Sequence, residues 1–267
     1  MSPSEFFVAI VTAAVGGFFW VGWFWTAYQT NRLVRPRVRR ASLVVCFIAC
    51  LGFVLSALLT VADPQVRENL GYFVLFMGVE LTALAAVTVA GIVIGLGTLD
   101  DALRRPNSAA AWATGGLWLG TSIAVAGANV GRGDTIGTTL GPLVLAVITI
   151  LVLWTVFSLA TGGMRSITLD RNDPSGVRLS ALFVAWGIIL GRAVAGDWES
   201  TRGMWDDFVN QGRPVVLLLV VAVVVERLLR PSVRRPTPPR WVGWLPAVGY
   251  LAVAVVWATW LGRPEGT

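Results

Sequence analysis

The sequence contains no lysine and no histidine, so all 21 of its basic residues are arginines. Without histidine the chain lacks the usual haem ligand, the base of serine–histidine triads and the usual ligand of catalytic zinc. Without lysine it cannot form the Schiff base on which retinal proteins depend. Acid-pair catalysis by aspartate and glutamate stays open. We nevertheless expect a non-enzymatic protein with no metal and no cofactor, apart from a bound lipid.

Charge and cysteine are also scarce. Charged residues make up 13% of the chain, hydrophobic residues make up 55%, and the mean hydropathy is +0.71. The two cysteines, Cys46 and Cys50, are four residues apart and would share one helix face. Because this spacing differs from the CxxC motif, we expect both thiols to be small core side chains. A bound metal or a redox pair is the less favoured alternative.

Apolar stretches of about 20 residues dominate the sequence, which is the length that a helix needs to cross a bilayer. Their polarity does not alternate as it would in the strands of a membrane β-barrel. The sequence therefore predicts an all-α, polytopic transmembrane helical bundle of about eight spans, which forms a single integral membrane domain over residues 1–267. The predicted spans are residues 6–28, 41–61, 70–96, 109–130, 138–160, 178–195, 214–229 and 241–261.

The arginines cluster between alternate spans, and short loops rich in arginine are retained in the cytoplasm. We therefore expect a bacterial cytoplasmic (inner) membrane protein with both termini outside. Residues 1–5 carry no basic cluster, so a cleavable signal peptide is not expected. Since topology explains the charge, the expected partners are membrane lipids and not nucleic acid. The arginines assigned to the cytoplasmic side are Arg32, Arg35, Arg37, Arg39, Arg40, Arg104, Arg105, Arg165, Arg171, Arg178, Arg227, Arg230, Arg234, Arg235 and Arg240.

An internal repeat is visible in the spans 109–130 and 178–195. Each carries a GxxxG motif, and each ends in Ala-Val-Ala-Gly. The sequence thus predicts parallel hairpin repeats at about 109–161 and 178–229, which either duplicate a packing unit or build a transport path. Small residues at this spacing let helix backbones approach closely in lipid, so we expect them to pack helices. The motif glycines are Gly116, Gly120, Gly187 and Gly191.

The turn over residues 170–176, the helix pattern over residues 185–193 and their weaker echo over residues 105–127 carry a resemblance. Over about residues 100–230 the chain resembles an uncharacterised family of bacterial inner-membrane proteins with duplicated transmembrane hairpins. Members of this domain-of-unknown-function family are often associated with proteins that resemble phage shock protein A. The resemblance implies a role in the envelope stress response, and it implies no catalytic residue.

Polar residues inside the apolar spans indicate where a function would lie, because a buried charge in a membrane is usually paired or functional. Glu80 is the deepest of these, and Arg192 lies at a similar depth from the same side. We expect an ion pair between Glu80 and Arg192, joined by Asn129. Such a cluster either links hairpins or serves as a protonatable site in an ion pathway. Glu226, next to Arg227, is expected to form a local pair at the membrane interface.

The loop over residues 197–211 carries large apolar side chains at helical spacing between acidic residues. This pattern predicts a short amphipathic helix in the outer interface, which either closes a hairpin or docks a partner. The apolar residues of this partner segment are Trp198, Met204, Trp205 and Phe208.

Two functions fit these observations. The first is a membrane subunit or scaffold that uses its GxxxG faces and the partner segment to bind other membrane proteins or a second copy of itself. The second is a small transporter or channel for ions or protons that uses Glu80 and Arg192. We favour the first, because a solute pathway normally needs several polar groups that face one cavity.

Overall fold

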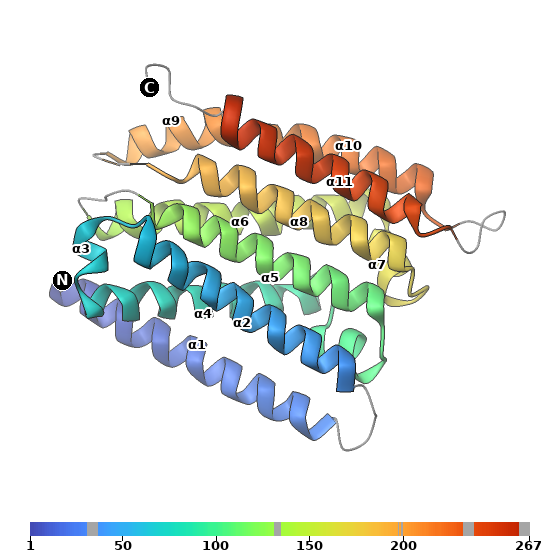
Figure 1. Cartoon of the computed structure of the whole chain (residues 1–267), viewed down its shortest axis with the longest axis horizontal. Coiled ribbons are helices and arrows are strands. Elements are labelled where there is room, and N and C mark those ends of the chain that lie inside the picture. Colours follow the sequence, from blue (N-terminus) through green and yellow to red (C-terminus); the bar gives the residue numbers. More distant parts are fainter. Residues whose placement is uncertain (31–36, 131–134, 197, 199, 232–237, 262–267) are drawn as a thin grey trace.

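The computed structural model describes residues 1–30, 37–130, 135–196, 198, 200–231 and 238–261, which form helices and no strand (Figure 1). The all-helical class is therefore confirmed. The long helices are α1 (Pro3–Thr30), α2 (Arg37–Thr60), α4 (Leu70–Ile94), α5 (Ser108–Ala128), α6 (Ile136–Thr161), α8 (Asp173–Ala193), α9 (Thr201–Gly212), α10 (Pro214–Leu229) and α11 (Trp241–Val256). The short elements are α3 (Pro64–Arg67), α7 (Gly163–Thr168) and the π-helical turns η1 (Thr98–Arg104) and η2 (Trp257–Leu261).

Within the described residues, eight helical segments are long and apolar enough to cross a membrane, which makes the chain a multi-pass membrane protein. Seven of the predicted spans differ from these segments mainly by short extensions at their ends. The predicted span 214–229 corresponds to α10, and α9 precedes it in one continuous candidate span, Thr201–Leu229. At a rise of about 1.5 Å per residue, α10 alone is about 24 Å long, which is shorter than a hydrocarbon core of about 30 Å. The candidate span Thr201–Leu229 reaches this thickness only with part of α9.

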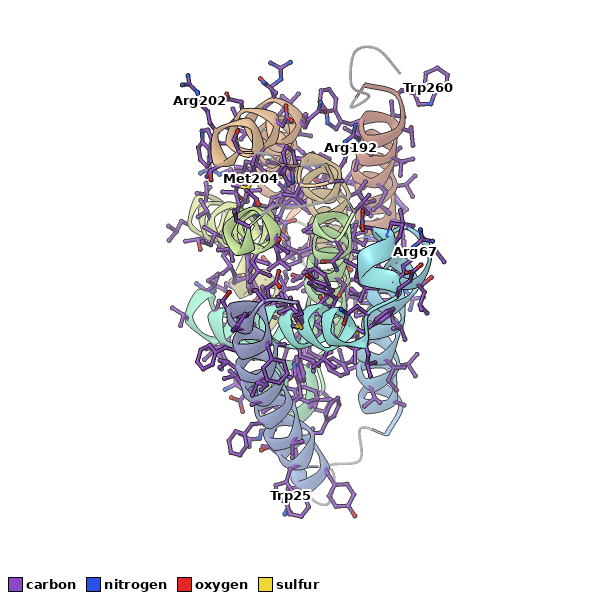
Figure 2. All side chains as sticks on the ribbon, turned by 90° about the vertical axis from the view of Figure 1, so that its left-hand side faces the viewer. Trp25, Arg67, Arg192, Arg202, Met204 and Trp260 are labelled. Carbon is purple, nitrogen blue, oxygen red and sulfur yellow. The ribbon has the colours of Figure 1, made fainter. Side chains whose placement is uncertain are left out.

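The long helices form two layers (Figures 1 and 2). Helices α2, α5, α8 and α11 lie side by side in one layer, and α1, α4, α6 and α10 lie side by side in the other. All helices of one layer run in the same direction, opposite to those of the other layer. The arginine-rich end of the bundle is where α4, α6 and α10 end and where α5, α8 and α11 begin. The described arginines at this end include Arg104, Arg105, Arg165, Arg171, Arg227, Arg230 and Arg240.

Glycines bring α5 and α8 into backbone contact along their whole length. A Cβ atom on Gly120 would overlap the carbonyl oxygen of Phe183, and one on Gly187 would overlap that of Gly120. Gly116 faces the backbone of Ser180 in the same way, and Gly191 faces Ile123. Close contact of this kind stabilises helix pairs in lipid, where water supplies no hydrophobic drive between helices. Because these four motif glycines are buried within the molecule, they are not available as a lateral surface for another protein.

A second close pair joins α1 to α4. A Cβ atom on Gly16 would lie 2.7 Å from Cβ of Leu81, and one on Gly78 would lie 2.7 Å from the backbone nitrogen of Ala13. The indole Nε1 of Trp20 donates to the carbonyl oxygen of Leu81 at 2.9 Å. These contacts hold α1 to the bundle even though most of its residues are exposed.

The start of α8 differs from the predicted span. We expected the span to begin at Arg178, but α8 begins at Asp173, because the side chain of Asn172 caps its first turn and Pro174 occupies the first turn. The Asn172 Oδ1 atom accepts from the backbone N–H of Ser175 at 2.9 Å. Arg178 therefore lies inside a buried helix and not at the edge of a loop.

Candidate functional site

Glu80 lies at the centre of α4, fully buried against α5. The hydroxyl of Ser122 on α5 donates to its Oε1 atom at 2.5 Å, while Oε2 has no hydrogen-bond partner among the described residues. A second polar contact joins the same two helices, because Nε1 of Trp118 donates to Oγ1 of Thr88 at 2.9 Å. The seam between α4 and α5 thus holds a carboxyl group in a closed contact between helices.

The predicted ion pair between Glu80 and Arg192 is wrong. The described ion pairs do not include one between these residues, and Glu80 binds Ser122 instead. Glu80 belongs to α4 in one layer, and Arg192 belongs to α8 in the other, at the end of the bundle opposite the arginine-rich end (Figure 2). The rise along a helix predicts how deep a residue lies in the bundle. It does not predict which neighbouring helix the side chain faces, and α5 lies between the helices of Glu80 and Arg192.

Asn129 does not link these two residues either. It ends α5 at 3% exposure, and neither its Oδ1 nor its Nδ2 atom has a hydrogen-bond partner in the described part of the chain. Glu80, Asn129 and Arg192 therefore do not form one polar cluster.

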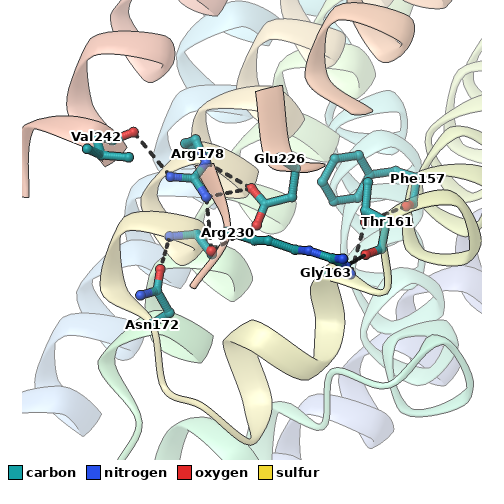
Figure 3. Close-up of polar contacts among 9 residues, drawn as sticks. Phe157, Thr161, Gly163, Asn172, Arg178, Glu226, Arg230 and Val242 are labelled. Carbon is teal, nitrogen blue, oxygen red and sulfur yellow. Dashed lines mark hydrogen bonds and ion pairs between the residues drawn. The ribbon is translucent and has the colours of Figure 1, made fainter. Parts of the chain in front are cut away.

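The charged site that the sequence analysis missed is an ion pair between Arg178 of α8 and Glu226 of α10 (Figure 3). Their charged groups approach to 2.7 Å, and their side chains are only 2% and 4% exposed. Ser175 completes the pair, since its hydroxyl lies 2.8 Å from Oε1 of Glu226 and 3.0 Å from Nη2 of Arg178. The Nη1 atom of Arg178 donates to the carbonyl oxygen of Val242 at 3.1 Å. One buried guanidinium group thereby connects α8, α10 and α11.

The expected local pair between Glu226 and Arg227 is also wrong. Arg227 points to the end of α6, where its Nε and Nη2 atoms donate to the carbonyl oxygen of Ala160 at 3.0 Å and 2.7 Å. Arg230 donates to the carbonyl oxygen of Thr161 at 3.3 Å. These two arginines bind the last carbonyl groups of α6, so Glu226 pairs with Arg178. The capped turn at Asn172 was the sequence signal that would have placed Arg178 inside the span.

The partner segment lies partly inside the bundle. A helix forms there, α9, and it packs Met204 and Phe208 inward at 7% and 9% exposure. The sulfur of Met204 approaches the Gly141 position on α6, and the ring of Trp198 covers Gly196. Only Trp205 points outward, with 52% exposure. Asp197 and Glu199, which we assigned to the same segment, fall outside the described residues. Three of the four apolar side chains therefore close the hairpin and cannot meet a partner.

The exposed faces of the described residues include the following three grooves. The largest of these three, about 840 Å³, lies along α1 beside Phe47 and Leu81. The second, about 380 Å³, lies over α5 between α2 and α8, and the third, about 260 Å³, lies between α5, α8 and α11 at the arginine-rich end. None of these three grooves is lined by Glu80, Arg178 or Glu226.

Metal ligands are not grouped in the part of the chain that the structure describes, where no cluster of three or more Cys, Asp or Glu residues is found. Asp100 binds Arg104 at 2.7 Å, and Asp101 accepts from the backbone N–H of Gly97 at 2.8 Å. The thiols of Cys46 and Cys50 are free. The carboxylates of Asp100 and Asp101 thus stabilise the turn that follows α4.

Comparison of the chain with protein-family models, with curated proteins and with solved structures finds no match.

Proposed function

We propose that this chain is a non-enzymatic integral membrane protein that acts as a subunit or scaffold of a membrane complex. The observation that carries the proposal is that the buried charged groups bind within the bundle. Arg178 and Glu226 satisfy each other, and Glu80 faces Ser122 in a closed contact. A transport pathway would instead need several polar groups that face one water-filled cavity. The close backbone contact between α5 and α8 favours a rigid scaffold over a transporter whose helices move.

The surface that we propose for a partner is the outward side of α9. Trp205 is 52% exposed and Val209, one turn later, is 46% exposed. The motif glycines do not contribute to this surface, since they face each other inside the bundle. The partner is another membrane protein or a second copy of the chain.

A Trp205→Ala variant tests this surface, with Trp260→Ala as its matched control. Trp260 is 77% exposed and lies in η2, directly after α11, whose last residues lie at the same end of the bundle as α9 (Figure 1). Membranes are solubilised in mild detergent, and the size of the native complex is measured by native electrophoresis and mass spectrometry. We expect Trp205→Ala to release the chain from its complex about tenfold more readily, as for a tryptophan hot spot. Equal complexes from both variants and the wild type would reject this surface.

The second candidate function is a proton- or ion-coupled transporter, and the unpaired Oε2 atom of Glu80 favours it. Glu80→Gln keeps an acceptor for Ser122 but removes the titratable group. We expect wild-type and Glu80→Gln proteoliposomes to pass protons and monovalent cations no faster than empty liposomes. A gradient-driven flux in the wild type that the variant loses would establish transport and overturn the scaffold proposal.

The orientation and the biological setting belong to the same proposal. The arginine-rich end lies in the cytoplasm of a bacterium and both termini lie outside, which the arginine distribution supports. In a cysteine-free background, an impermeant thiol reagent should label Ser4→Cys in intact cells but not Asp170→Cys. The side-by-side, parallel arrangement of α5 with α8 and of α6 with α10 supports a duplicated hairpin.

An envelope-stress role rests on the family resemblance alone. It predicts that the chain recruits a co-expressed protein resembling phage shock protein A to the membrane. If the protein that resembles phage shock protein A stays in the soluble fraction when it is produced together with this chain, the envelope-stress role is rejected.

A further inference from the structure

Two of the three grooves meet at Trp112 on the exposed face of the α2–α5–α8–α11 layer. The groove over α5 is almost wholly apolar, with Leu43, Leu119 and Val184 among its lining residues. The adjoining pocket is lined by Trp112 and Trp244, whose rings meet edge to face with centroids 5.8 Å apart, and by Asp173 and Arg240. The apolar groove thus adjoins a pocket that is lined by one cationic and one anionic side chain.

The groove has the length of one lipid leaflet. It follows α5 from Ser108, the first residue of the helix, to Leu119. The eleven helical steps from Ser108 to Leu119, at about 1.5 Å each, cover about 16 Å, and half of a hydrocarbon core of about 30 Å is about 15 Å. The groove therefore starts at the membrane interface of the arginine-rich end and reaches the middle of the bilayer, as an acyl chain does. Its depth comes from Ala111 and Gly115, whose small side chains leave room over α5.

The pocket separates its two charges. Arg240 is exposed, and its guanidinium group makes no ion pair or hydrogen bond with the described residues. Asp173 accepts a hydrogen bond from the hydroxyl of Ser108 through Oδ1 at 2.5 Å, and its Oδ2 atom accepts none from the described residues. The two side chains line the same space of about 260 Å³ without pairing across it. This arrangement fits a molecule that carries both an anionic and a cationic group.

We propose that this face binds a phospholipid with an ethanolamine headgroup, with an acyl chain in the α5 groove, its phosphate at Arg240 and its ammonium group at Asp173. A guanidinium group binds phosphate oxygens in a charge-assisted, bidentate manner. A primary ammonium group has three donors for a carboxylate. Trp112 and Trp244, each about half exposed, lie at the depth where tryptophan anchors in the membrane interface.

The charges decide between this lipid and others of the same leaflet. A glycerol headgroup brings the phosphate without an ammonium group, so Asp173 repels it. A choline headgroup brings a cation without N–H donors, which leaves only the contact with the tryptophan faces. The structure therefore assigns the order ethanolamine, then choline, then glycerol. This order holds whether the chain is a scaffold or a transporter, so it stands or falls separately from the proposed function.

The test uses the purified full-length chain in mild detergent. Synthetic phospholipids with identical acyl chains and ethanolamine, choline or glycerol headgroups are added at equal amounts, and bound lipid is counted by native mass spectrometry. We expect about tenfold more ethanolamine lipid than glycerol lipid, the ratio that one charge-assisted hydrogen bond provides. Asp173→Asn should remove the preference for ethanolamine over glycerol. Arg240→Gln should lower binding of all three lipids about tenfold.

Matched controls come from α9, at the other end of the bundle. Asp206→Asn and Arg202→Gln make the same charge changes at exposed positions and should leave the lipid counts unchanged. Gly115→Leu fills the groove, because the nearest atom to a Cβ at this position is Sγ of Cys46, 3.5 Å away. It should lower binding of every lipid. If Gly115→Leu does not fold, Asp173→Asn and Arg240→Gln still test the headgroup site.

Equal counts for all headgroups in all variants would show annular lipid only and would overturn the proposal. A preference for the glycerol lipid, or an ethanolamine preference that survives Asp173→Asn, would equally reject the assigned headgroup site.

Discussion

The individual residues of this bundle differ in how their polar groups are satisfied. Arg178 and Glu226 have partners for most of their donors and acceptors, while Glu80 has a partner for one oxygen only. Removing one member of a buried ion pair leaves the other charge without compensation, which is more destabilising than replacing both by apolar groups. The Arg178–Glu226 pair is therefore the position at which a single substitution should affect stability most.

Glu226→Met should destabilise the protein by about 3–5 kcal/mol, because it leaves the Arg178 guanidinium buried and unpaired. The double variant Arg178→Met with Glu226→Met should recover most of this loss. Arg227→Met is the control, since its side chain binds an exposed carbonyl group at the end of α6 and should change stability by no more than about 1 kcal/mol. Unfolding in mixed detergent micelles, followed by circular dichroism, measures the difference. A double variant as unstable as the single one would contradict this account.

At the scale of the elements, helix ends and helix pairs decide which residues are buried. The apolar runs predict the helices well, because length and hydropathy alone select them. The start of α8 was misplaced by five residues because an apolar run does not include a polar first turn, whereas Asn172 and Pro174 mark that turn by capping. That error hid the Arg178–Glu226 pair. Contacts between helices that are distant in the sequence are harder to predict, because only the positions of small residues indicate them.

The α5–α8 contact depends on glycine at particular positions. Gly120→Ala and Gly187→Ala each add a Cβ atom that overlaps the backbone of the other helix, so the helices must separate. We expect each variant to lose about 1–3 kcal/mol, the range for overpacked positions. Gly52→Ala is the matched control, because a Cβ atom at Gly52 would have no atom of another helix within 4 Å. The same micelle unfolding measures all three variants, and equal stability of Gly120→Ala and Gly52→Ala would argue against close backbone contact.

At the scale of the whole molecule, the two layers explain both the success and the failure of the sequence analysis. Depth along the membrane normal follows from counting residues in a helix, so Glu80 and Arg192 were placed at similar depth. The layer to which each helix belongs does not follow from such counting, because it depends on contacts between segments that are far apart in the sequence. Glu80 consequently meets Ser122 on α5, which lies between α4 and α8, whereas Arg192 lies in the last turn of α8.

The layers also predict how much of each helix meets the lipid. In the most apolar stretch of each span, 83% of the residues are buried in the central helix α8, whereas 22% are buried in α1 and 28% in the span that begins with α11. A photoactivated carbene reagent dissolved in the lipid of proteoliposomes should therefore label peptides from α1 and α11 several-fold more per residue than peptides from α8, because only side chains that face lipid are within its reach. Labels are counted by mass spectrometry, with chain unfolded in strong detergent as the control for intrinsic reactivity. An α8 labelled as heavily as α1 would mean that α8 lies at the edge of the bundle, and then α5 could not hold α8 on one side and Glu80 on the other.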